Sequence, residues 1–175
     1  GFQNNLLNKF ITSKFPMSNF FLSDISYNVI TTSKLTNLKV CFDVDQWPFC
    51  KNIFNLIVSN CYLHVSNNLN ILFKKINDSL CNNGFLITAM PGKNNLIELK
   101  ESMIKIDLDL YKGAFQRFLN FNTIESLINL INKNNFKIPV IDIDTIEIRY
   151  NNFASLLKDI RYLSNTNLYY DRKKI

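Results

Sequence analysis

The sequence is poor in the residues that build fibrous proteins, metal sites and disulfide frameworks. It holds only 4 glycines and 4 prolines among 175 residues, which excludes a collagen-like or low-complexity chain. Its single histidine, His64, has no clustered partner, and its 4 cysteines form no CxxC pair. We therefore expect no metal site and no disulfide framework, and we predict a reducing, cytoplasmic setting.

Long apolar runs are also missing. No stretch reaches the length of a membrane span and no secretory signal is legible, so we expect no contact with a membrane. The net charge of +6 would suit an acidic partner. The basic residues are scattered, however, and their densest run, residues 172–174, is typical of a solvated tail. Because they are not interleaved with stacking aromatic residues, we expect no nucleic-acid binding.

What the sequence does have is the composition and periodicity of one globular domain. With 47% hydrophobic residues, the chain can bury a single core over residues 1–175. Helical spacing alternates with short apolar runs, which is typical of an α/β protein with a parallel sheet. The apolar runs that predict strands are residues 19–22, 38–42, 54–58 and 85–90, and the longest early helices are predicted at 4–14, 26–34 and 69–80.

The last part of the chain predicts a different arrangement. Residues 137–142 and 145–150 alternate apolar and polar side chains across a short break, which is typical of a β-hairpin. We therefore predict a mostly parallel sheet with one antiparallel C-terminal strand, followed by a helix over 152–163. Residues 92–121 are a candidate substrate lid, although aromatic residues at their near-helical spacing usually belong to a core.

Polar side chains follow three of the predicted strands. Ligands of open parallel sheets bind beyond the carboxyl ends of the strands, which makes these positions informative. Asp24 is a candidate acceptor for the ribose hydroxyls of an adenosine-containing cofactor, and Asp43, beside the Val44 backbone, for its adenine amine. Ser59 and Asn60 would lie beneath the reactive end of the cofactor. The structural alternative is that Asp24 caps a helix and Asp43 opens a turn.

These residues, in this order, resemble the class I (Rossmann-like) S-adenosylmethionine-dependent methyltransferases. The resemblance covers nearly the whole chain and is carried by residues 24–26, 43–49, 54–64 and 82–86. Residues 54–64 are similar to the family segment FDLIVSNLALHW, with Asn55 in place of the usual acid and Val65 in place of the usual tryptophan. The resemblance implies an S-adenosylmethionine site made by Gly1, Asp24, Ile25, Asp43, Val44, Ser59 and Asn60.

The beginning of the chain resembles the end of a family loop. Gly1-Phe2 is similar to the last residues of the segment DLGCGTGF, which precedes the first helix of the family. The resemblance therefore implies that the first strand and most of the glycine-rich loop are absent from this chain. The strands that end at Asp24 and Ser59 would then lose their shared neighbour, and the cofactor site would be incomplete.

The C-terminal half resembles two branches of the family through residues 91–100, 136–139, 142–144 and 157–168. One branch contains the malonyl-carrier-protein methyltransferase of biotin synthesis (BioC), which implies methylation of a malonyl thioester on acyl carrier protein. The related branch contains a mitochondrial complex I assembly factor that hydroxylates an arginine, which implies a protein that binds or modifies a protein partner. Because both branches share the stretch at residues 159–161, the sequence leaves both open.

Arg161 and His64 are the candidate catalytic residues. A malonyl carboxylate is already anionic, so it requires a cation that orients it rather than a strong base, and Arg161 suits that task. The alternative is a surface ion pair of Arg161 with Asp159 or Glu147. His64 is a candidate base or orienting group, with packing at a helix start as its alternative. We also expect packing roles for Trp47 and Tyr62.

Overall fold

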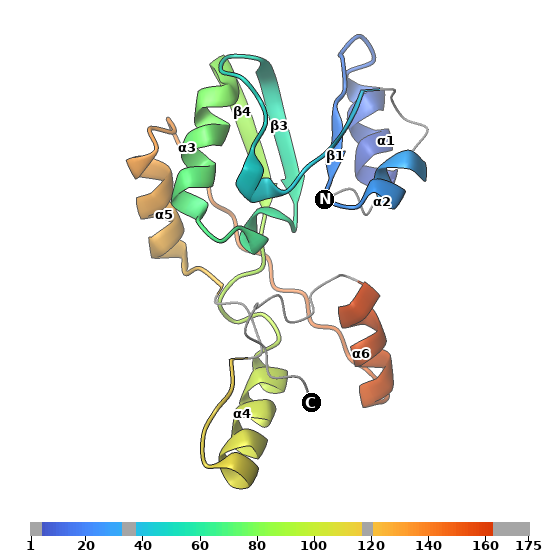
Figure 1. Cartoon of the computed structure of the whole chain (residues 1–175), viewed down its shortest axis with the longest axis vertical. Coiled ribbons are helices and arrows are strands. Elements are labelled where there is room, and N and C mark those ends of the chain that lie inside the picture. The colour runs from blue at the N-terminus through green and yellow to red at the C-terminus, as the bar shows by residue number, and fades with distance from the viewer. Residues whose placement is uncertain (1–4, 33–37, 117–120, 163–175) are drawn as a thin grey trace. The chain divides into compact units, whose positions relative to one another are not determined.

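The computed structural model describes residues 5–32, 38–116 and 121–162 (Figure 1). Helices and strands alternate through the first half of the chain, which confirms the predicted α/β class. The elements are α1 (Asn5–Lys14), β1 (Leu22–Asp24), α2 (Tyr27–Thr32), β2 (Lys39–Cys41), the 3₁₀ helix η1 (Val44–Gln46), β3 (Phe54–Asn60), the 3₁₀ helix η2 (Leu63–Val65), α3 (Leu69–Ser79), β4 (Leu80–Ala89), α4 (Ile97–Tyr111), α5 (Ile124–Lys133) and α6 (Phe153–Tyr162).

The chain divides into two compact units. The first comprises residues 1–90 and 130–136, and the second residues 91–129 and 137–175. The first unit holds β1 to β4 with α1, α2 and α3, while the second holds α4 and α6. The expectation of one domain over residues 1–175, with 92–121 as a lid, stays a prediction.

The strands form two parallel pairs rather than one continuous sheet. β1 pairs with β2, with Asp24 opposite Cys41, and β3 pairs with β4, with Ser59 opposite Thr88. In each pair the connecting segment carries a helix, α2 or α3, so each is a βαβ unit. Among the described residues no strand bridges β1 and β3. Figure 1 shows β1 standing apart from the β3–β4 pair.

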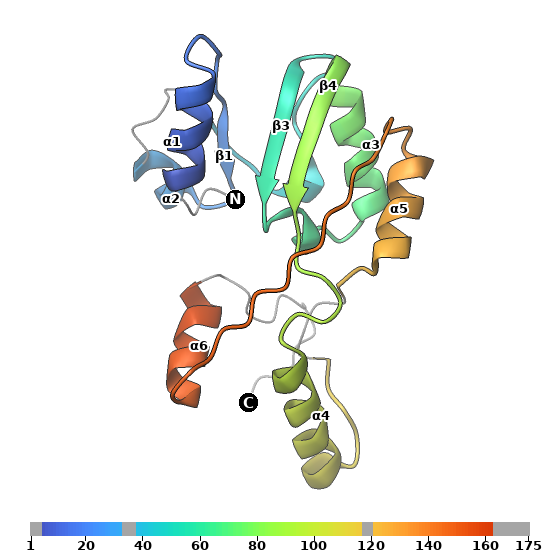
Figure 2. The same ribbon diagram turned by 180° about the vertical axis from the view of Figure 1, so that it is seen from behind.

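The hydrophobic core of the first unit lies between α3 and one face of the β3–β4 pair. Figure 2 shows the two strands in front of α3. Ile57 and Leu86 are opposite one another in the strand register and pack against this core from the sheet side. Asn68 begins α3, because its side chain accepts a hydrogen bond from the backbone N–H of Ile71 at 3.1 Å. The buried core residues are Val44, Leu63, Leu72, Ile76 and Leu80.

A cluster of aromatic rings joins the two strand pairs. The rings meet edge to face, with centroid distances from 4.9 to 5.8 Å. Phe21 precedes β1 and Phe54 begins β3, so their contact at 5.8 Å spans the gap between the pairs. The cluster comprises Phe21, Phe42, Trp47, Phe49 and Phe54.

Gly84 is needed where β4 begins beside β3. β4 starts at Leu80, earlier than the sequence predicts, and the register with β3 shifts between Phe54 and Leu56. A Cβ atom on Gly84 would lie 3.0 Å from the carbonyl oxygens of Cys81 and Phe54. Close backbone approach therefore explains this glycine, and the positive φ at this turn belongs to Asn83.

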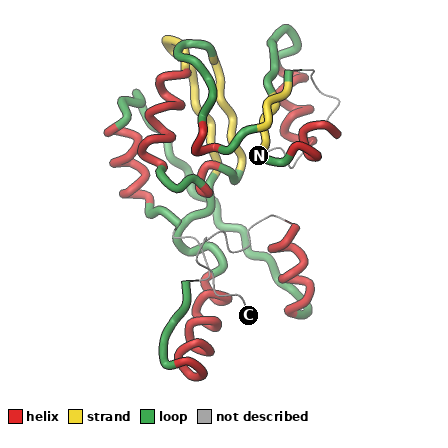
Figure 3. The backbone as a smooth tube through the Cα atoms, in the orientation of Figure 1, coloured by secondary structure: helices red, strands yellow, loops and turns green. Residues whose placement is uncertain are grey.

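The predicted C-terminal hairpin is absent from the structure. Residues 137–150 are described, and they carry no strand or helix (Figure 3). Their apolar side chains are exposed, with Ile138 at 89% and Val140 at 88%. The prediction of an antiparallel strand at 145–150 is therefore wrong for this structure. Period-2 alternation forms a strand only where another strand supplies hydrogen bonds, and none does so here.

Candidate functional site

Asp24 is a buried carboxylate at the carboxyl end of β1. It is the last residue of that strand and is 7% exposed. Its Oδ1 atom accepts a hydrogen bond from the backbone N–H of Ser26 at 2.9 Å, immediately before α2. Asp24 therefore has the helix-capping role that the sequence analysis gave as the structural alternative.

Asp43 follows β2 and begins η1. Its carboxylate accepts a hydrogen bond from the backbone N–H of Asp45 at 3.0 Å, so it also performs the structural task expected of a turn residue. Asp43 is exposed. Val44 is 2% exposed and belongs to the core, which leaves only its backbone for contact with a ligand.

The charges of both Asp24 and Asp43 act on the hydroxyl of Tyr62. Burial, followed by the nearby charges of Asp24, Asp43, Cys41 and Asp45, raises the pKa of its hydroxyl to about 12. Asp24 ends β1 and Asp43 follows β2, so carboxylates from the carboxyl ends of both strands lie within electrostatic range of Tyr62, which follows β3. Its hydroxyl oxygen is buried and has no hydrogen-bond partner in the described part of the chain. Sequence reasoning assigned Tyr62 to packing and missed this position.

Two further buried hydroxyls lie at the carboxyl end of the β3–β4 pair. Ser59 and Thr88 are opposite one another in register, and Ser59 is 8% exposed. They follow Ile57 and Leu86 by two residues, which places them on the α3 side of the strands. Neither hydroxyl oxygen has a hydrogen-bond partner among the described residues. Buried polar atoms are normally bonded, so these positions suit a polar ligand or an ordered water.

The chain leaves β3 through a constrained turn at Cys61. Its φ angle of 48° lies in the left-handed region, and its backbone N–H donates to the carbonyl of Ala89 at 2.9 Å. A non-glycine residue in this region costs about 1–3 kcal/mol and persists where the surroundings fix it. The turn reverses the chain so that Tyr62 and η2 pack back against the core. Its position at the strand end agrees with a ligand site there.

The structure places the remaining predicted residues as follows. Ile25 is exposed beside Asp24, and Asn60 is exposed at the end of β3. His64 lies half-buried in η2, and its catalytic role stays a prediction. Gly1 lies outside the described residues. Ile25 and Asn60 thus lie at strand ends, whereas His64 lies in the 3₁₀ helix that follows β3.

Arg161 lies in the last turn of α6, in the second compact unit, and is exposed. The two carboxylates considered as its surface partners make other contacts. Glu147 pairs with Arg149 at 3.1 Å, and the Asp159 side chain hydrogen-bonds to Tyr150, whose pKa is raised by burial and by that bond. The proposed substrate-binding role of Arg161 stays a prediction.

Asp45 is a structural residue that sequence reasoning missed. Its carboxylate accepts hydrogen bonds from the Ser66 hydroxyl at 2.5 Å and from the Asn67 backbone N–H at 3.1 Å, and a further one from the Asn67 side-chain amide. Burial acts to raise the pKa of Asp45, but these bonds and the Lys75 ammonium lower it below its usual value. The cluster ties η1, next to Asp43, to the segment that follows Tyr62.

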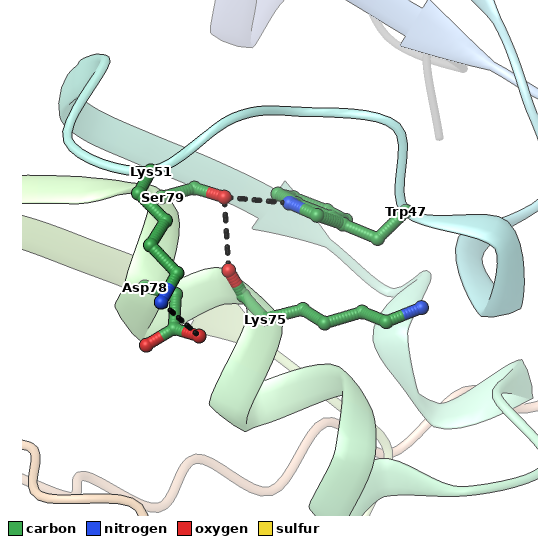
Figure 4. Close-up of polar contacts among 5 residues, drawn as sticks. All are labelled: Trp47, Lys51, Lys75, Asp78 and Ser79. Carbon is green, nitrogen blue, oxygen red and sulfur yellow. Dashed lines mark hydrogen bonds and ion pairs between the residues drawn. The ribbon is translucent and has the colours of Figure 1, made fainter.

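Trp47 performs the packing role expected of it. Its indole Nε1 donates to the Ser79 hydroxyl at 2.8 Å, and that hydroxyl donates to the Lys75 carbonyl at 2.9 Å (Figure 4). Lys51 and Asp78 lie 4.0 Å apart next to this pair. These contacts fasten the loop after η1 to the end of α3.

Within residues 5–32, 38–116 and 121–162, no three His, Cys, Asp or Glu side chains gather as a metal site. In the same ranges no helix combines the length and the apolar character that crossing a membrane requires.

Comparison with known proteins reveals two groups of relatives, although no family model matches the chain. It is 28% identical over 166 residues to the human protein named arginine-hydroxylase NDUFAF5, mitochondrial, covering 93% of this chain and 48% of that protein. It is 27% identical over 164 residues to the protein of the same name from Danio rerio, covering 92% and 51%. The malonyl-[acyl-carrier protein] O-methyltransferase of Gallionella capsiferriformans is 22% identical over 169 residues, covering 90% and 56%.

A solved structure shares the fold. It is an S-adenosylmethionine-dependent methyltransferase of Thermotoga maritima, described as a possible histamine N-methyltransferase, with a TM-score of 0.50 and 17% identity over 66% of this chain and 54% of that one. The chain spans about half the length of the curated relatives that it matches. The resemblance found in the sequence is confirmed: the chain is a homologue of the NDUFAF5 and malonyl-[acyl-carrier protein] O-methyltransferase proteins, with the Rossmann-like fold of S-adenosylmethionine-dependent methyltransferases.

Proposed function

We propose that the protein is an S-adenosylmethionine-dependent methyltransferase. The observation that supports this most is the gathering of Asp24, Asp43 and Tyr62 at the carboxyl ends of parallel strands. Nucleotide-like ligands bind at such ends in open α/β sheets. The shared fold and the relatives named as O-methyltransferases add support from outside the site.

The residues present fit the adenosine part of the cofactor. Asp24 and Asp43 supply acceptor oxygens, which suit the donors of an adenosine, namely the ribose hydroxyls and the adenine amine. Ile25 offers an exposed apolar surface beside Asp24, and the Val44 backbone adjoins Asp43. Ser59 and Asn60 stand at the end of β3. The bound cofactor would supply an electrophilic methyl group, and the protein would hold the acceptor in line and exclude water.

For the methyl acceptor, we propose a carboxylate, as in a malonyl thioester carried by acyl carrier protein. Such an acceptor is anionic at neutral pH, so the site requires no strong base. This agrees with a chain that contains 1 histidine. Arg161 would receive the carboxylate through two parallel N–H bonds, and His64 would orient the thioester. Support comes from the engagement of Glu147 and Asp159 with other side chains.

A second candidate is a protein that binds or modifies a partner during assembly of a respiratory complex. It is supported by identities of 27% and 28% to the relatives named arginine-hydroxylase NDUFAF5. In this case the same cofactor site would serve a protein acceptor. A cytoplasmic setting stays a prediction.

Calorimetric titration with S-adenosylmethionine and S-adenosylhomocysteine tests the proposed cofactor. We expect the full-length protein to bind both, and Asp24→Ala to weaken binding by about 1–3 kcal/mol, the scale for removing a partner from a charged hydrogen bond. Asp78→Asn is the control, because Asp78 is a carboxylate near the end of α3 that pairs with Lys51 and precedes the amino end of β4, away from the carboxyl ends of the strands. Equal affinities for wild type and Asp24→Ala would remove Asp24 from the site.

Mass spectrometry of the acceptor distinguishes the two candidate functions. The full-length protein, cofactor and malonyl-acyl carrier protein should give a product heavier by one methyl group. Arg161→Ala should lose this activity and keep cofactor affinity, whereas Arg149→Ala, at an arginine already paired with Glu147, should keep both. A protein that binds the cofactor, leaves the malonyl thioester unmodified and restores respiratory-complex assembly in a deletion strain would establish the second candidate.

A further inference from the structure

The Tyr62 hydroxyl is a buried polar group without a partner in the described part of the chain. Leaving such a group unbonded costs about 1–3 kcal/mol, which a phenylalanine at the same position would avoid. Packing against the core explains the ring of Tyr62 but not its oxygen. The hydroxyl therefore calls for a bonding partner from outside the described residues.

The surroundings of Tyr62 define what kind of partner suits it. The charges that act on its hydroxyl come mainly from Asp24 and Asp43, the two carboxylates at the ends of β1 and β2. With its pKa raised from 10.0 to about 12, the phenol is protonated at neutral pH. Tyr62 is thus a hydrogen-bond donor in an acidic neighbourhood, while the two carboxylates are acceptors.

The end of β3 carries a second buried hydroxyl without a partner among the described residues, that of Ser59. Ser59 is more than nine-tenths buried, and its hydroxyl oxygen also lacks a hydrogen-bond partner in the described ranges. It lies on the face of β3 that packs toward the same core as Tyr62, opposite Thr88. Unsatisfied hydroxyls that gather at one end of a strand pair suit a polar ligand at that end.

Adenosine offers both kinds of hydrogen-bonding group. Its ribose hydroxyls and exocyclic amine are donors that match the carboxylates, and its ring nitrogens and ribose oxygens are acceptors that carboxylates cannot satisfy. We propose that the Tyr62 hydroxyl is a third contact for the adenosine of the cofactor, donating a hydrogen bond to an acceptor atom that lies between the groups bound by Asp24 and Asp43. This inference rests on the proposed function and deepens it.

The test compares wild type with Tyr62→Phe in the full-length protein. Calorimetric titration with S-adenosylhomocysteine should show about a tenfold loss of affinity in the variant, the scale for one well-placed hydrogen bond. The thermal midpoint of the ligand-free variant should equal or exceed that of wild type, because an unpartnered buried oxygen has been removed. Tyr150→Phe removes a hydroxyl that bonds to Asp159 in the second unit and should leave the affinity unchanged.

Each outcome bears on one proposal. Unchanged affinity in Tyr62→Phe, with wild type binding normally, overturns the role of Tyr62 and leaves the proposed function standing. A thermal midpoint several degrees lower in the ligand-free variant also overturns it, since the hydroxyl would then be part of the fold. A wild-type protein that binds no S-adenosylhomocysteine counts against the proposed function itself.

Discussion

Asp45 and Asn67, which are 22 residues apart in the sequence, join two loops through hydrogen bonds. The Asp45 carboxylate accepts from the backbone N–H of Asn67 at 3.1 Å and also from the Asn67 side-chain amide. Asp45→Asn should therefore lower the free energy of unfolding by about 1–3 kcal/mol, the range for hydrogen bonds to a charged group. Urea denaturation measures this, with Asp78→Asn as the surface control. A variant as stable as wild type would show that the loops meet without this carboxylate.

The pH dependence of stability should also reveal Asp45. Its folded-state pKa is lowered below the ordinary value of 3.8, so its contribution is present above that value and is lost as the pH falls through the folded pKa. Denaturation of wild type and Asp45→Asn between pH 2 and pH 6 measures the difference, where about 4 marks the expected onset of the loss. Parallel curves at all pH values would contradict the prediction.

Tyr62 should affect the pH dependence of stability in the alkaline range. Its pKa rises from 10.0 to about 12, so the native state favours the protonated phenol. The stability that depends on that proton is complete below pH 10 and is lost as the pH rises toward 12. Tyr62→Phe should unfold with a shallower alkaline slope than wild type in thermal melts. An equal slope in the two proteins would show that Tyr62 titrates normally.

Gly84→Ala should destabilise the first unit. The added Cβ would meet two carbonyl oxygens at 3.0 Å, and relieving this requires the start of β4 to move away from β3. A cost of about 1–3 kcal/mol is expected, as for overpacking in a tight interior. Gly92→Ala is a matched control, since a Cβ atom added there would have no atom within 4 Å and the φ of Gly92 is not positive. Equal urea midpoints for the two variants would contradict the close approach.

Ser79→Ala should loosen the loop that carries Trp47. The indole N–H would lose its acceptor, at a cost of about 1–3 kcal/mol for a buried donor left unbonded. The protein contains 1 tryptophan, so its fluorescence reports on this loop alone. We expect a shift of the emission maximum to longer wavelength in Ser79→Ala and none in Ser102→Ala, whose exposed hydroxyl bonds to its own helix.

The parallel strands and the polar residues at their ends could be predicted from the sequence, because short apolar runs and the residues that follow them are local signals. Asp24 and Asp43 also show why such signals stay ambiguous, since each carboxylate performs the capping role that competes with ligand binding. The choice between the two roles depends on what faces the remaining oxygens. That is a property of the assembled strand ends.

The features that sequence reasoning missed depend on contacts between distant segments. Asp45 is recognisable only when the loop before α3 is next to η1, and Tyr62 only when two strand ends surround it. The alternation at 137–150 indicates which side chains would share a face, but it carries no information about whether a partner strand is present. The close approach at Gly84 likewise follows from strand register, which no local pattern fixes.

Over the described ranges the two βαβ units share no hydrogen-bonded strand, so they can fold in either order. The β1–β2 pair forms with α2, and the β3–β4 pair with α3, each within a short stretch of chain. The folding of one pair therefore does not require the other. The bonds of Asp45 to Ser66 and Asn67 then form as the two βαβ units dock. Pulse-labelling hydrogen exchange should accordingly find two sets of amides that gain protection at independent rates, with the Asn67 amide protected last.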